Sequence, residues 1–192
     1  DSSLDLNPRK DKAKITFASY LHNFDTSFIF TNYEANHSEF NKFITCLSYA
    51  LLNYQSSYNE IIEYTSPEDD IIRAYTTAFS FIVMNFIDEL FIYDAKKYAT
   101  AYKIKVLYDI LFYCLISEFE ESLYHDIKTD IEERYEIFRK LHTEYFPFIS
   151  VDKNEFDVGM WWLNYNNLFN TPMLSINYAI GDISGLDFCN NF

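Results

Sequence analysis

The chain has 192 residues, of which 49% are hydrophobic and 20% are aromatic, a composition that supports a packed core and argues against intrinsic disorder. Its formal net charge of −14 would repel a phosphate backbone, which argues against nucleic-acid binding, whereas a basic peptide or protein would be attracted. Only 3 Gly and 4 Pro occur, so a glycine-rich phosphate loop is excluded and long helices are favoured.

The first half of the chain predicts one strand and two helices. Residues 1–20 are polar and then mixed in character, and residues 26–33 alternate as in a short strand. Apolar residues recur at spacings of three and four over residues 38–58, which predicts an amphipathic helix. A second helix is predicted to start at Ser66-Pro67-Glu68-Asp69, with Ser66 as its cap, and to run towards Leu90. It is apolar on nearly all sides over residues 78–86, which predicts a central, buried position.

The second half predicts helices only. Residues 93–119 show long helical periodicity, and Lys128-Thr129-Asp130 opens a charged helix that Pro147 closes. Two further helices are predicted over residues 155–167 and 172–188. With no internal repeat and no low-complexity linker, the pattern predicts one compact, mainly α-helical unit with a small β element.

Cysteine content and hydropathy bear on the cellular compartment. The three cysteines (Cys46, Cys114 and Cys189) lie in apolar or helical segments, as is typical of reduced, buried thiols in a cytoplasmic protein. The longest apolar run, residues 78–87, is too short to span a bilayer, and no signal peptide is recognisable. We therefore expect a cytoplasmic protein that is not transmembrane.

Residues 27–33 read S-F-I-F-T-N-Y, and residues 45–53 read T-C-L-S-Y-A-L-L-N. In this order they resemble the strand P-F-I-F-A-N-F and the zinc-site helix T-H-E-x-G-H-A-F of the oligoendopeptidase F and thimet oligopeptidase family of zinc metallopeptidases. Further matches occur in the family's order at Asp5–Ala13, Ser66–Phe81, Glu132–Arg134, Glu144–Pro147 and Trp162–Phe188.

The resemblance implies a mainly α, zincin-like helical catalytic domain over residues 1–192, with a small β element near residues 26–33. In the family, a helical half precedes this part and further residues follow it. The resemblance thus implies that the chain belongs to a longer polypeptide or to a complex.

The residues that carry the family's chemistry are replaced. The two zinc-binding His positions fall on Cys46 and Ala50, the position of the Glu that activates water falls on Leu47, and the third zinc ligand falls on Arg73. A zinc hydrolase needs three protein ligands, an open coordination position and a base. The resemblance therefore implies a pseudopeptidase that needs no metal or other cofactor.

Several of these residues have two interpretations. Arg73 could bind a peptide carboxylate, but an internal ion pair with one of the many acids is favoured. Cys46 could in principle act as a nucleophile, but no His lies near it in the sequence, so a packed helix residue is favoured. The pair Trp161-Trp162 could line a groove, but a core position is favoured.

Three residues fall where the family holds its substrate or near such positions. The family's substrate-binding His falls on Asn167, a kept Tyr is Tyr178, and a His on the helix of the third ligand falls on Tyr75. These are possible residual peptide contacts.

We expect a catalytically inactive protein that serves as a structural or protein-binding component of a larger assembly. Its partner would be another protein or the remaining part of its own polypeptide. The alternatives are a module that still binds peptides in the cleft and a subunit of an oligopeptidase.

Overall fold

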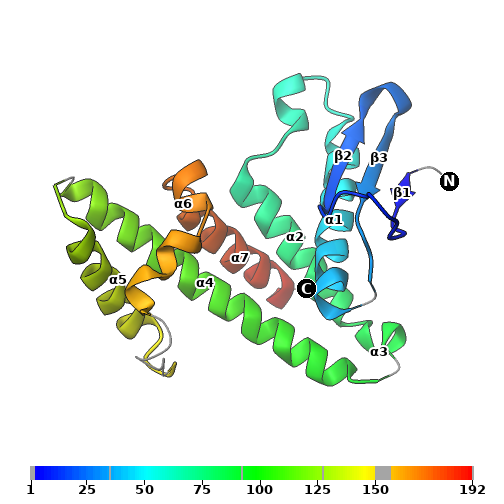
Figure 1. Cartoon of the computed structure of the whole chain (residues 1–192). Coiled ribbons are helices and arrows are strands. Elements are labelled where there is room, and N and C mark those ends of the chain that lie inside the picture. The colour runs from blue at the N-terminus through cyan, green and yellow to red at the C-terminus, as the bar shows by residue number, and fades with distance from the viewer. Residues whose placement is uncertain (1–2, 35, 92, 127, 150–156, 192) are drawn as a thin grey trace. The chain divides into compact units, whose positions relative to one another are not determined.

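A computed structural model of the chain describes residues 3–34, 36–91, 93–126, 128–149 and 157–191 (Figure 1). The chain divides into two compact units, Asp1–Tyr102 with Gly181–Phe192 and Lys103–Ile180. That residues 1–192 form a single domain remains a prediction.

The first unit contains a small three-stranded sheet. Its strands are β1 (Leu4–Asp5), β2 (Phe17–Leu21) and β3 (Thr26–Phe30), in the order β1-β3-β2, with β1 parallel and β2 antiparallel to β3. The predicted strand is confirmed as β3. The sequence analysis missed β1 and β2, because two residues are too few to show alternation and β2 lies in a mixed polar stretch on the edge of the sheet.

One helix packs on this sheet, and a second helix packs on the first. Helix α1 (His37–Ser56) starts at Asn36, whose side chain accepts a hydrogen bond of 2.9 Å from the Glu39 N–H. Helix α1 contacts β2, β3 and α2 (Asp69–Met84), as Figure 1 shows. The apolar side chains of α1 and α2 meet those at the start of α4 (Ala95–His125) in a core that includes Phe40, Ile44 and Met84.

The start and the end of α2 differ from the prediction. Ser66 does not cap the helix, because a 3₁₀ helix (Ile62–Thr65) ends at Ser66 and Glu68 takes the cap position without a side-chain hydrogen bond. The helix also does not continue to Leu90. It ends at Met84, and a separate short helix α3 (Ile87–Leu90) follows.

Helix α2 is also less buried than predicted. Ile82 is 45% exposed and Phe86, just beyond the helix, is 55% exposed. An all-apolar run suggests burial on every side, but the structure covers only part of this helix.

The second unit holds most of α4 (Ala95–His125), together with α5 (Ile131–Tyr145) and α6 (Asn167–Asn170). Its core gathers Phe119, Phe138 and Trp162, which confirms a core position for Trp162. The helix predicted over residues 155–167 is wrong: residues 155–156 lie outside the described residues, and Val158–Asn164 form a 3₁₀ helix. The last helix, α7 (Ser175–Asn190), begins in this unit and continues into the first from Gly181 onward.

Candidate functional site

Of the four residues that the family resemblance predicts at zinc-site positions, three lie on α1. Cys46 and Ala50 are one turn apart and share a face of the helix, and Leu47 follows Cys46. Burial raises the pKa of the Cys46 thiol, so the neutral thiol is favoured over the thiolate that binds metals or attacks substrates. Ala50 is buried, and its carbonyl accepts a hydrogen bond of 2.7 Å from the Ser27 hydroxyl on β3. At Ala50, therefore, α1 is bound directly to β3 of the sheet.

The fourth position, Arg73 on α2, forms an internal ion pair. Its Nε and Nη2 donate to the two carboxylate oxygens of Asp182 on α7, at 2.7 and 2.9 Å. The Asp182 carboxylate is completely buried and also accepts a hydrogen bond of 2.5 Å from the Thr77 hydroxyl. Such a bidentate geometry is the stronger of the arrangements in which arginine binds a carboxylate. The favoured interpretation of Arg73 is confirmed.

Two glycines bring α7 close enough to α2 for this pair to form. A Cβ atom at Gly181 would lie 2.6 Å from the Cβ atom of Arg73, and one at Gly185 would lie 2.6 Å from the carbonyl oxygen of Ala74. Real Cβ atoms essentially never approach so closely. The absence of side chains at these two positions, one turn apart, thus lets the short Asp182 side chain reach α2.

The residues at these four positions do not fit a zinc ion. Leu47 and Ala50 offer no ligand atom, the Cys46 thiol is kept neutral by burial, and the Arg73 guanidinium is a fixed positive charge. Within the part of the chain that the structure describes, no group of three His, Cys, Asp or Glu is placed to hold a metal ion.

The three possible peptide contacts are distributed over both units. Tyr75 lies on α2 in the first unit, and its hydroxyl approaches Oε1 of Gln55 on α1 at 3.4 Å. In the second unit, the Tyr178 ring lies 5.4 Å from that of Tyr113, and Asn167 begins α6. A joint role of these three residues in binding a peptide stays a prediction.

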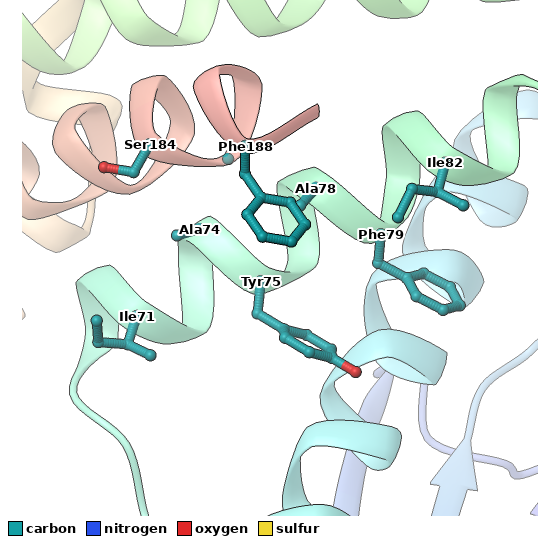
Figure 2. A pocket seen from close by; sticks show the side chains of 9 residues that line it. Ile71, Ala74, Tyr75, Ala78, Phe79, Ile82, Ser184 and Phe188 are labelled. Carbon is teal, nitrogen blue, oxygen red and sulfur yellow. The ribbon is translucent and has the colours of Figure 1, made fainter. Parts of the chain in front are cut away.

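An apolar groove lies on the first unit, along α2 and beside the C-terminal part of α7. It encloses about 410 Å³. Figure 2 shows Ile71, Tyr75 and Ile82 along α2, with Phe188 reaching over from α7. The full lining consists of Ile71, Ala74, Tyr75, Ala78, Phe79, Ile82, Ser184, Gly185 and Phe188.

A second, smaller pocket of about 210 Å³ lies between β2, the C-terminal half of α1 and the loop before α2. Its lining is mostly polar and does not include Cys46, Leu47, Ala50 or Arg73. The lining residues are Ala18, Ser19, Tyr20, His22, Tyr49, Asn53, Ser57, Thr65 and Ser66.

The sequence analysis missed Asp182, Thr77 and the two glycines. One signal was available: the chain has only 3 Gly, and two of them stand four residues apart on one predicted helix. Such a spacing lets two helices approach closely, which could have placed the α7 backbone against another helix before the structure was known.

No family model and no curated protein matches the sequence. Three solved structures do match the fold. PZ peptidase A, solved with an inhibitor, has a TM-score of 0.84 and 23% sequence identity, and a protein assigned as oligoendopeptidase F has a TM-score of 0.82 and 20% identity. A protein from Bacillus anthracis strain Ames, also assigned as oligoendopeptidase F, has a TM-score of 0.75 and 22% identity.

Each match covers 98% of this chain but only 31–34% of the other chain, so this chain spans about a third of the length of those peptidases. The likeness confirms the predicted fold, a mainly α-helical peptidase fold with a small sheet. Among the helices that the structure describes, none is long and apolar enough to cross a membrane.

Proposed function

We propose that this chain is a peptidase-fold protein without peptidase activity, and that it acts as a protein-binding or structural component of a larger assembly. The single observation that supports the loss of activity most is the ion pair of Arg73 with Asp182. Both oxygens of a buried carboxylate bind this arginine, which by the family resemblance stands where a zinc peptidase of this fold has an acidic ligand.

The base and the ligands are also missing from the opposing helix. Leu47 cannot take a proton from water, and Ala50 cannot bind a cation. Relative to the family's acidic ligand, Arg73 carries the opposite charge. Asp182 neutralises this positive charge within the protein. This neutralisation supports a structural role for Arg73 in the contact between α2 and α7, in place of a role at a metal site.

A binding role is supported by the apolar side chains that the first unit exposes along α2. Exposed contiguous apolar patches of several hundred Å² mark interaction sites in many proteins. The alternatives, a peptide-binding module and a subunit of an oligopeptidase, differ from this proposal in what they bind or cleave.

The proposal is tested by measuring zinc and hydrolysis on the same purified chain. We expect far less than one zinc per chain by elemental analysis and no cleavage of internally quenched peptides, with or without added zinc. A variant that combines Cys46→His, Leu47→Glu, Ala50→His, Arg73→Glu and Asp182→Gln supplies the control for zinc binding. Stoichiometric zinc or cleavage by the unaltered chain would overturn the proposal.

A further inference from the structure

We infer that the apolar groove along α2 and α7 binds a cationic amphipathic helix of a partner protein. The inference rests on the proposed protein-binding function and names the surface and the chemistry of the partner.

The groove has the length and the surface of a helix-binding site. It follows α2 from Ile71 to Ile82, which at about 1.5 Å per residue is about 16 Å, or three turns of a docked helix. Ile71 is 55% exposed, Ile82 is 45% exposed, and Phe188 from α7 is 51% exposed (Figure 2). A helix that places apolar side chains at positions i, i+3, i+4 and i+7 would cover these residues.

The lining does not suit a small polar ligand. Pockets for such ligands combine apolar walls with a few polar groups that converge on one point. Here only Tyr75 and Ser184 contribute polar side chains, and the Tyr75 hydroxyl approaches Gln55 on α1. Apolar contact over an extended surface is the interaction that this lining offers.

The groove is separate from the lost zinc position. At about 100° per residue along a helix, Arg73 lies on the side of α2 opposite to Ile71 and Ile82. The Arg73 side chain pairs with Asp182 there, while Ile71 and Ile82 line the groove. The inference therefore concerns a different surface from the one where a peptidase of this fold would cut.

The negative charge on the segments around the groove favours a positively charged partner. Between residues 58 and 91, and in α7, the only Lys or Arg is Arg73, which Asp182 neutralises. Exposed acids lie just before Ile71, just after α2, and next to Phe188. They are Glu68, Asp69, Asp88, Glu89 and Asp187. A docked helix with Lys or Arg beside its apolar stripe would meet complementary charge on the segments that flank the groove lining in sequence.

The test uses two labelled peptides of about 20 residues, long enough to cover the groove as a helix. Both carry Leu at positions i, i+3, i+4 and i+7, and they differ only in carrying Lys or Glu beside this stripe. Binding to the 192-residue chain is followed by fluorescence anisotropy at low and high salt. The variants are Ile82→Asn and Ile71→Asn, with Ile104→Asn, at a 61% exposed site on α4, as the matched control.

We expect the Lys peptide to bind, and the Glu peptide to bind at least about tenfold more weakly at low salt. Each groove variant should weaken binding of the Lys peptide about tenfold, because an apolar contact is lost, and Ile104→Asn should leave it unchanged. Circular dichroism checks that each variant is folded.

No binding of the Lys peptide, equal binding of both peptides, or equal binding by all variants would overturn the inference. So would a dimer of the chain, seen by sedimentation, that Ile82→Asn disperses, since the occupant would then be a second copy. Mass spectrometry of the recovered peptide separates the two proposals. A cleaved peptide contradicts the proposed loss of activity, whereas an intact peptide that does not bind contradicts only the inference.

Discussion

The internal contacts that stabilise the first unit differ in kind from those that stabilise the second. In the first unit, α7 meets α2 through two glycines and the buried pair of Asp182 with Arg73. In the second, the core is aromatic: the Phe119 ring lies 5.2 Å from that of Phe138, edge to face, and 5.4 Å from that of Trp162. Neither Phe119 nor Asp182 is exposed to any measurable extent.

The difference concerns how much each contact depends on a specific partner. Apolar burial in the second unit is roughly proportional to area and needs no particular partner atom. The ion pair in the first unit needs both charges and a close backbone approach, because either charge alone would be buried without compensation. The contact in the first unit should therefore be the more easily rescued by a matched second substitution.

The largest effect is expected from Phe119→Ala in the second unit. Removing this fully buried ring should lower the free energy of unfolding by about 3–5 kcal/mol, because it leaves a cavity among close-packed neighbours. The measurement is urea unfolding followed by tryptophan fluorescence, since both Trp of the chain, Trp161 and Trp162, lie in this unit. Phe24→Ala, at a 75% exposed site, is the control and should change little.

A slightly smaller effect is expected from Arg73→Met in the first unit. The substitution leaves the Asp182 carboxylate buried without its cation and should cost about 3 kcal/mol. Adding Asp182→Leu should restore most of this loss, because replacing both charges by apolar groups removes the desolvation penalty. Urea unfolding followed by circular dichroism gives the values for the double-mutant cycle. If the double variant were no more stable than Arg73→Met, the contact would not be the specific pair described.

The smallest effect is expected from Glu120→Gln on α4. Glu120 is 2% exposed. One of its oxygens accepts a hydrogen bond of 2.8 Å from the Met173 N–H, and the other has no partner among the described residues. Burial raises the pKa of this carboxyl above its ordinary value of 4.5, although the Met173 bond partly opposes the shift. The folded state thus binds the proton more readily than the unfolded state, so the destabilising effect of Glu120 grows as pH rises from 4.5 to the raised folded pKa and is complete above it.

Glu120→Gln should therefore raise the free energy of unfolding by about 1 kcal/mol at pH 7.5. The gain should shrink as pH falls through the raised pKa towards 4.5, where the carboxyl is neutral in both states. Unfolding curves at several pH values measure this. The exposed neighbour Glu121 provides the control substitution Glu121→Gln, and an equal gain from both would rule out burial as the cause.

Most helices could be predicted from the sequence because their apolar residues recur with helical spacing. The periodicity of α1 and α5 and the opening of α5 after Lys128-Thr129-Asp130 are local features, and the structure confirms them. The cap assigned to Ser66 was wrong because the residues before it form a 3₁₀ turn that shifts the helix start to Glu68 and Asp69. The helix predicted over residues 155–167 was wrong because the segment winds more tightly, with Trp162 and Gly159 buried.

The sequence by itself determined the mainly helical class and the strand before α1, and it carries Cys46, Leu47, Ala50 and Arg73 where the family resemblance predicts zinc-site residues. These depend on residue identity and on periodicity over short stretches. Only the tertiary structure decided which acid pairs with Arg73, which side of α2 remains exposed, and that β2 joins the sheet. Each of these depends on contact with a distant segment: Asp182 lies 109 residues beyond Arg73, and no local pattern encodes how closely Gly181 lets the two helices approach.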